Sequence, residues 1–245
     1  MAHLSSIVTE KEFTDSQVYN HEKSAFSMMR SLTSTALGFA MLYTKFQPAV
    51  WNFIDAKLHA ADMCFSTALR QDMAMAILFV VITTLIDAIL DEPFNLYSTF
   101  VIEEKYGFNK TTAKTYVTDK IKGYAVGLVL LSVLIPVILS VVDYAGEHLV
   151  VSLSLVTFTF ILLLQIIIPT FILPLFFKFT DLSEKHQDLE KMILEEAVKT
   201  GVPISQVKVI DGSKRSSHSN AFVTGFWRFR KVVLFDTLLD TQSNE

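Results

Sequence analysis

Four long apolar runs, separated by polar stretches, dominate the first 177 residues of the sequence. A helix of roughly 20 apolar residues crosses the hydrocarbon core of a bilayer, so these runs predict transmembrane helices. The first run is the weakest, because it is short, rich in Ser and Thr, and contains Lys45. The predicted spans lie at about 31–47, 73–90, 123–142 and 149–177.

Two polar residues fall inside these spans. Asp87 is a functional candidate by default, because ionisable groups are costly inside a membrane. The alternative, which the sequence favours, is that Asp87 lies within a turn of the helix end and reaches the interface. Gln165, in the fourth span, is expected to face protein. That span is longer than a bilayer requires, so we expect it to bend at Pro169 and Pro174.

The segment from Pro93 to Lys122 has an amphipathic pattern and five lysines, typical of a connector on the cytosolic side. Gly107 predicts a turn in this connector, and Asn109 or Thr111 is expected to cap the following helix. With four spans, the positive-inside rule places the tail after Phe177 on the same face.

After Phe177 the pattern changes to that of a small α+β segment. A helix is predicted from an N-cap at Ser183 through Thr200, with Gly201 as its stop. Short strands are predicted at 207–210, 221–226 and 232–235. The fold class is therefore mostly α, with polytopic membrane helices (1–177) followed by a small α+β segment (178–245). This segment has too little apolar surface to be a convincing domain alone.

Composition supports a membrane protein and excludes several classes. Of 245 residues, 51% are hydrophobic and 19% are charged, against roughly 25% charged in soluble domains. The net charge of −4 and the lack of an aromatic-basic stripe argue against nucleic acid. Cys64 is the single cysteine, so no internal disulfide forms, and we expect it to be buried or lipid-facing.

Motifs for catalysis or metal binding are absent from these 245 residues. The six histidines include no i, i+4 pair and no H-E-x-x-H, the helical arrangement that holds zinc beside a general base. G-x-S-x-G is also absent, and "GSKRSS" lacks the spacing of a phosphate loop. No catalytic or metal-ligating residue is therefore assigned within this chain.

The stretch "SSHSNAFVTGF" is the remaining candidate for a binding site. If its strand is the edge of a sheet, its unpaired N–H and C=O groups can receive an extended peptide. The alternative is an ordinary hairpin loop with a solvated His218. The residues alone favour the hairpin.

Three segments resemble the type I CAAX prenyl endopeptidases, zinc metalloproteases that process farnesylated proteins at the endoplasmic reticulum. They read "PFNLYSTFVIEEKYGFN", "PLFFKFTDL" and "DGSKRSSHSNAFVTGFWRFRKVVLFDTLL". The resemblance extends from about Lys11 to the end. Asp91 and Glu92 depart from it, because the family is less charged before the first of these segments.

The resemblance implies a seven-span barrel around a chamber, with zinc held by H-E-x-x-H and a distant Glu. In the family those ligands follow "VLFDTLL", so this chain is expected to lack them, along with the first span. The chain is thus interpreted as an incomplete multi-span metalloprotease that binds no zinc and is inactive by itself. Asn220, Ala221 and Phe222 match the family's N-A-[FY] strand, which implies that they bind the substrate backbone.

The implied partners are prenylated, farnesylated C-terminal CAAX peptides and the lipid bilayer, and the implied location is the endoplasmic reticulum membrane. Two alternatives remain open. One is a non-catalytic membrane protein, a truncated or degenerate copy acting as scaffold or lipid-binding module. The other, weaker one is a transporter-like bundle, for which only Asp87 and Gln165 are candidate polar groups.

Overall fold

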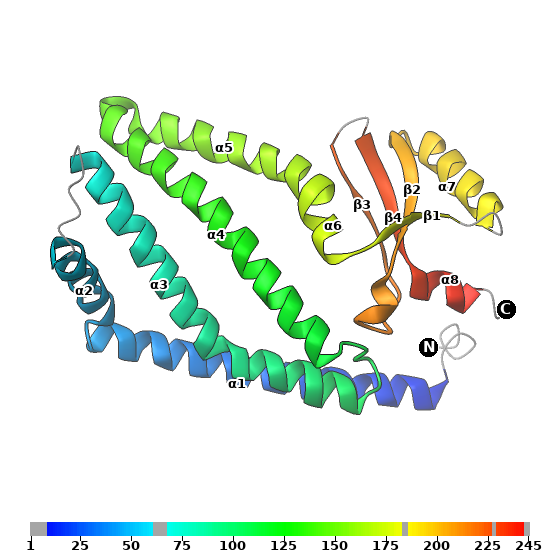
Figure 1. Ribbon diagram of the computed structural model, residues 1–245. Coiled ribbons are helices and arrows are strands. Elements are labelled where there is room, and N and C mark those ends of the chain that lie inside the picture. Colours follow the sequence, from blue (N-terminus) through cyan, green and yellow to red (C-terminus); the bar gives the residue numbers. More distant parts are fainter. Residues whose placement is uncertain (1–8, 61–67, 183–185, 227–228, 243–245) are drawn as a thin grey trace. The chain divides into compact units, whose positions relative to one another are not determined.

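The computed structural model describes residues 9–60, 68–182, 186–226 and 229–242. The chain divides into two compact units, Met1–Gly107 and Phe108–Glu245, and each is described by itself (Figure 1). Cys64 and the predicted N-cap Ser183 lie outside the described residues.

The first unit is helical. Its elements are α1 (Glu10–Tyr43), α2 (Phe46–Ala60), α3 (Ala68–Tyr97) and the π-helical turn η1 (Ser98–Glu103). A capping box fixes the start of α1, because Thr9 and Glu12 satisfy each other's backbone N–H. Ile54 and Leu58 of α2 are buried against Met75 of α3.

The end of α3 lies beyond the predicted boundary at residue 90. The helix continues through Pro93 into η1, so the connector begins later than the sequence indicated. Asp91 is tolerated there because Arg30 of α1 binds its carboxylate with two N–H groups. This ion pair explains how an acidic residue follows the apolar run directly.

A second set of polar contacts joins α1 to the end of this helix. The Tyr19 hydroxyl and the Lys23 ammonium both donate to the Glu103 carboxylate, each at 2.8 Å. The Lys105 ammonium lies 2.6 Å from Glu22. The hydrogen bond from Lys105 lowers the pKa of the Glu22 carboxyl.

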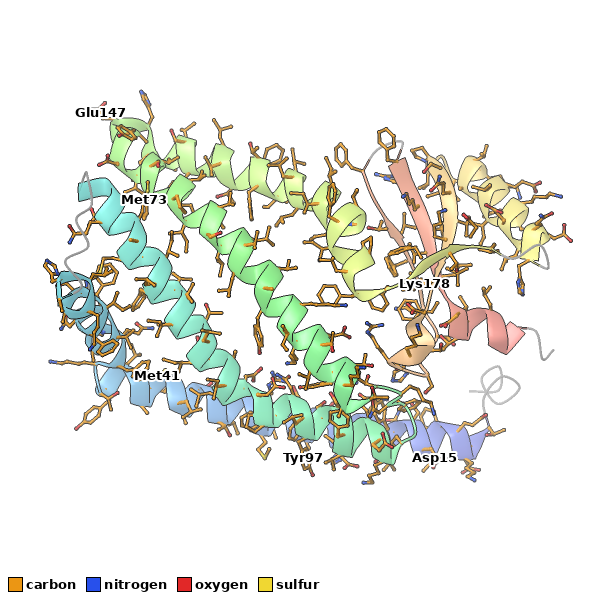
Figure 2. The ribbon with its side chains drawn as sticks, viewed as in Figure 1. Asp15, Met41, Met73, Tyr97, Glu147 and Lys178 are labelled. Atoms are coloured by element: carbon orange, nitrogen blue, oxygen red, sulfur yellow. The ribbon has the colours of Figure 1, made fainter. Side chains whose placement is uncertain are left out.

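The second unit begins with two long antiparallel helices and continues into a sheet. Figure 2 shows Glu147 at the turn between the two helices and Lys178 where the chain leaves them. The helical elements are α4 (Ala113–Tyr144), η2 (Gly146–His148), α5 (Leu149–Ile167), η3 (Ile168–Ile172), α6 (Leu173–Phe176), α7 (Gln187–Lys199), η5 (Gly212–Lys214) and α8 (Asp236–Gln242).

The predicted bend in the long apolar run is present. Pro169 lies in the π-helical turn η3 and Pro174 in the short α6, and the helix changes direction there (Figure 1). Gln165 is exposed on α5 within this chain, rather than covered by protein, and Asp87 is exposed on α3.

Of three local signals near helix ends, the two glycines have the predicted role and the N-cap does not. Gly107 takes φ 75° as predicted for a turn. The N-cap of α4 is Thr112, whose hydroxyl accepts from the Thr115 N–H, so the prediction of Asn109 or Thr111 was wrong. The Asn109 side chain instead accepts from the Thr111 N–H, so it stabilises a turn just before the N-cap. Gly201 stops α7 as expected, with φ 70°.

The sheet has four strands in the order β1-β2-β4-β3. Strands β2 and β4 are parallel, and the two outer pairs are antiparallel. Its core is formed by Val207, Ile210, Val233 and Leu234, with α7 packed on β2. The strands are β1 (Phe179–Asp181), β2 (Ile204–Ile210), β3 (Ala221–Thr224) and β4 (Arg230–Phe235).

Among the described residues, three helices are long and apolar enough to cross a membrane. They are Gln71–Glu103, Ala113–Tyr144 and Gly146–Phe176, and they include the predicted spans 73–90, 123–142 and most of 149–177. The predicted span 31–47 is not among them. A turn with Lys45 at φ 52° separates α1 from α2 inside that range, so the four-span topology stays a prediction.

Candidate functional site

The candidate strand lies at the edge of the sheet. β3 pairs with β4 alone, in the register Ala221↔Leu234 to Thr224↔Lys231, and it is the last strand in the order. The strand ends at Thr224 rather than at the predicted residue 226, because Gly225 turns away with φ 96°. The sequence left a hairpin and a sheet edge open, and β3 is part of both.

The register fixes which backbone groups of β3 face outward. The Phe235 N–H donates to the Asn220 carbonyl at 3.0 Å, so these opposed residues are a hydrogen-bonded pair. Hydrogen-bonded and non-hydrogen-bonded pairs alternate along an antiparallel ladder. Phe222 and Thr224 therefore direct their backbone groups to β4, whereas Ala221 and Val223 direct theirs to the outer edge.

The outward-facing N–H of Ala221 already has a hydrogen-bond partner, the side chain of Asn220. The Asn220 side-chain oxygen accepts from the Ala221 N–H at 2.8 Å. Along the strand, Ala221 and Val223 are exposed and Phe222 and Thr224 are half-buried, as the predicted alternation requires. Phe222 packs edge-to-face on Phe235, with ring centroids 6.2 Å apart. One face of β3 is therefore packed, and its outer edge is open to a further strand.

Arg215 holds the loop that leads into β3. Its guanidinium donates to Asp119 of α4 at 2.8 and 3.1 Å and to the Phe176 carbonyl at the end of α6. The same group lies 4.5 Å from the Phe177 ring centroid. Both charged side chains are only about a fifth exposed, so this pair is shielded from solvent and strongly directional.

The loop has further backbone contacts with the segment before α4. The Lys110 N–H donates to the Arg215 carbonyl, and the Ser217 N–H donates to the Phe108 carbonyl. The His218 ring stacks on Phe108 at 4.2 Å between centroids. His218 is exposed but stacked, so the prediction of a simply solvated side chain was incomplete.

Two aspartates fix the start of the same loop. Asp236 accepts from the Ser213 N–H at 2.8 Å, and Asp211 accepts from the Lys178 N–H at 2.7 Å. Burial by itself raises the pKa of the Asp211 carboxyl. Hydrogen bonds from Lys214 and from the Lys178 backbone outweigh burial, so the pKa of Asp211 lies below its usual value.

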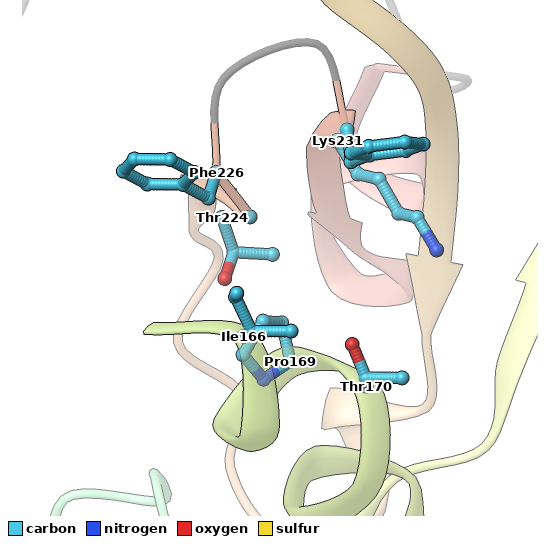
Figure 3. A pocket seen from close by; sticks show the side chains of 8 residues that line it. Ile166, Pro169, Thr170, Thr224, Phe226 and Lys231 are labelled. Atoms are coloured by element: carbon cyan, nitrogen blue, oxygen red, sulfur yellow. The ribbon is translucent and has the colours of Figure 1, made fainter. Parts of the chain in front are cut away.

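A cavity of about 630 Å³ adjoins the far end of β3 (Figure 3). One wall comes from the bend of the long apolar run and the other from the β3–β4 hairpin. Its only charged lining group among the described residues is Lys231. The lining residues are Ile166, Pro169, Thr170, Thr224, Gly225, Phe226, Phe229 and Lys231.

The described residues do not fit a zinc centre. Within those ranges, no three His, Cys, Asp or Glu side chains are grouped so that they could hold a metal ion. The site is therefore a strand edge, a tethered loop and an apolar cavity, an arrangement that can bind an extended peptide.

Comparisons with known proteins agree with this arrangement. The family model described as "CAAX prenyl protease N-terminal, five membrane helices" matches residues 2–178. The chain belongs to the CAAX prenyl protease family. Residues 183–245 match a second model, that of peptidase family M48. The chain is thus a multi-pass membrane protein from a family of metallopeptidases.

Individual relatives cover nearly all of the chain. A probable CAAX prenyl protease 1 of Schizosaccharomyces pombe is 37% identical over 240 residues, covering 96% of this chain and 50% of the relative. A CAAX prenyl protease 1 homolog of Mus musculus is 33% identical, covering 99% and 50%. The chain therefore spans about half the length of these curated relatives.

The fold is shared with a solved structure. The crystal structure of S. mikatae Ste24p superposes with a TM-score of 0.85 at 32% identity, covering 96% of this chain and 53% of that one. The predicted fold class, membrane helices followed by a small α+β segment, is confirmed.

The sequence predicted the candidate strand but not the ion pair and the neighbouring strand that hold its surroundings in place. Asn220, Ala221 and Phe222 lie together at the start of β3, as their adjacency requires. Asp119 was overlooked, although an acidic residue near the start of an apolar helix predicts a basic partner. The short strand β1 carries no alternating pattern that would reveal it in the sequence, and its three residues pair with β2.

Proposed function

We propose that this chain is the membrane-embedded, substrate-binding part of a zinc metalloendopeptidase that cleaves prenylated CAAX-type proteins in the endoplasmic reticulum membrane. The family assignment supports the reaction class. The open outer edge of β3 is the single observation that carries the role of this chain.

In this proposal the substrate peptide adds to the outer edge of β3 as a further strand. The N–H and C=O of Val223 pair with the peptide backbone, and main-chain hydrogen bonds of this kind supply affinity without demanding a particular side chain. The Asn220 amide turns away from the Ala221 N–H and bonds to the peptide instead. Ala221, with a small exposed side chain, allows the peptide to approach closely.

Arg215 acts as a positioning residue in this scheme. It joins the loop before β3 to Asp119 of α4 and to the end of α6. Because Arg215 holds the loop to both α4 and α6, the edge strand keeps a fixed place relative to these helices. A substrate anchored in the bilayer by its prenyl group then meets the strand in a defined orientation.

The catalytic zinc is assigned to residues outside these 245. No H-E-x-x-H occurs in the sequence, and the described residues do not fit a metal centre. We therefore expect the purified chain to bind no stoichiometric zinc and to cleave no peptide. Metal analysis that finds one zinc per chain, together with cleavage of a farnesylated peptide, would overturn this assignment.

The binding role is tested with two substitutions at one position. The chain is reconstituted in lipid nanodiscs, and the dissociation constant of a farnesylated CAAX peptide is measured. Val223→Pro removes the outward N–H but no bond to β4, and proline is tolerated at such edge positions. Losing one hydrogen bond of this kind weakens binding roughly three- to tenfold.

Val223→Ala is the matched control, because it shortens the same exposed side chain and keeps the N–H. We expect its dissociation constant to stay within about twofold of the wild type, since Val223 is 56% exposed. Equal affinity of the Pro and Ala variants would contradict strand addition. If the wild-type chain binds no peptide at all, a non-catalytic scaffold or lipid-binding module becomes the better description.

A further inference from the structure

The cavity at the end of β3 lies next to the proposed peptide path. Thr224, the last residue of the strand, lines the cavity, and Gly225 and Phe226 continue its wall. In a sheet, residues directly opposite each other on neighbouring strands project from the same face. A peptide residue opposite Thr224 therefore projects its side chain from the face on which Thr224 meets the cavity.

The cavity is also within reach of the bilayer. Pro169 and Thr170 precede Phe176, the last residue of a candidate membrane span, by about two turns. At 1.5 Å per residue, this places them roughly 10 Å from the end of the span. A hydrocarbon chain dissolved in the membrane can enter at this depth without first passing through water.

The residues that line the cavity are mostly apolar and suit an apolar ligand. Phe226 is 41% exposed and Phe229 is 79% exposed within the described residues, so both rings at the cavity present apolar surface that a ligand can cover. The volume of about 630 Å³ falls within the range of roughly 300–1,000 Å³ typical of small-molecule sites. Lys231 also lines the cavity (Figure 3), and the methylenes of a lysine can pack on an apolar ligand while its ammonium stays hydrated.

We propose that this cavity is the subsite for the isoprenoid chain on the cysteine of the substrate. The inference rests on the proposed function, because it assumes that a prenylated peptide pairs with β3. Strand pairing fixes the peptide backbone, and the cavity takes the prenyl group of the residue opposite the end of the strand. Together they select a peptide that carries a long apolar modification at one defined position.

A pair of tryptophan substitutions on one helix tests the subsite. Ile166 lines the cavity and Ile161 does not, although both are isoleucines of α5 that are 49% exposed. Their directions differ by about 140° around the helix axis. Ile166→Trp fills the cavity, and Ile161→Trp adds the same bulk elsewhere on the same helix.

The measurement compares farnesylated and unmodified forms of one CAAX peptide in nanodiscs of fixed lipid composition. Membrane partitioning favours the farnesylated form for every variant equally, so the comparison between variants isolates the subsite. We expect Ile166→Trp to weaken binding of the farnesylated peptide about tenfold. Excluding only two methylenes of the farnesyl chain from the cavity would lower the binding free energy enough to give that factor. The unmodified peptide should bind both variants alike.

A photoreactive farnesyl analogue on the same peptide provides a second measurement. Cross-links mapped by mass spectrometry should fall in residues 166–170, 224–226 and 229–231 of the wild type and disappear from them in Ile166→Trp. Equal affinity of the two tryptophan variants for the farnesylated peptide, with cross-links elsewhere, would overturn the subsite.

Failure of the subsite is distinguishable from failure of the proposed function. If Val223→Pro weakens both peptides while the two tryptophan variants behave alike, strand pairing stands and the subsite is wrong. If neither peptide binds the wild-type chain, both the proposed function and the subsite are wrong.

Discussion

Replacing Asp119 by Asn tests whether the ion pair with Arg215 holds the loop before β3 in place. The change keeps the size of the side chain and removes its charge. Arg215 then retains the Phe176 carbonyl and the Phe177 ring but loses two charge-assisted hydrogen bonds. Because both partners are only about a fifth exposed, water replaces these bonds incompletely.

Hydrogen bonds to charged groups contribute about 1.5–3 kcal/mol. The Asn oxygen still accepts one weaker bond, so we expect a net loss of about 2 kcal/mol in the free energy of opening the loop. Since 1.4 kcal/mol corresponds to a factor of ten, hydrogen exchange of the loop amides should accelerate roughly 30-fold. The reporting amides are Ser217, which donates to Phe108, and Lys110, which donates to Arg215.

Asp188→Asn is the matched control, because its pair with Lys191 is 3.9 Å long and the Asp188 side chain is 99% exposed. An exposed pair of this kind contributes little, so exchange of Ser217 and Lys110 should be unchanged in this variant. If Asp119→Asn also leaves both amides unchanged, the ion pair does not position the loop.

Two further predictions concern the same loop. Gly212→Ala should lower the free energy of unfolding by about 1–3 kcal/mol, because the added methyl would lie 2.5 Å from the Phe235 ring; Gly127→Ala meets nothing within 4 Å, so urea unfolding should show it unaffected or slightly stabilised. The lowered pKa of Asp211 means that its contribution is present above the unfolded pKa of about 3.9 and is lost as the pH falls through the folded pKa. The urea midpoint should therefore fall between pH 5 and pH 3 more steeply in the wild type than in Asp211→Asn, and identical slopes would contradict the assignment.

The membrane helices were predictable because long apolar runs have one structural solution in a bilayer. Their ends were less predictable. The helix that contains Asp91 continues past Pro93 because Arg30, 61 residues earlier, neutralises the carboxylate, and no local pattern reveals a partner at that separation. The turn at Lys45 likewise lies inside the weak apolar run that was predicted as the span 31–47.

The candidate strand was identified from the sequence, but its place in the sheet was not. Alternation of exposed and half-buried residues along Ala221–Thr224 follows from strand geometry. Whether that strand lies at an edge depends on the order β1-β2-β4-β3, which is set by long-range pairing. The contact between Arg215 and Asp119 joins residues 96 positions apart and is likewise a property of the folded chain.

Residue-resolved hydrogen exchange along β3 tests the proposed strand addition most directly. The backbone groups of Phe222 and Thr224 face β4, and those of Val223 face outward. On saturation with a farnesylated CAAX peptide, we expect exchange of the Val223 amide to slow at least about tenfold, while the amides of Phe222 and Thr224 change little. Binding of the peptide with no change at Val223 would contradict the proposal that this edge receives the substrate.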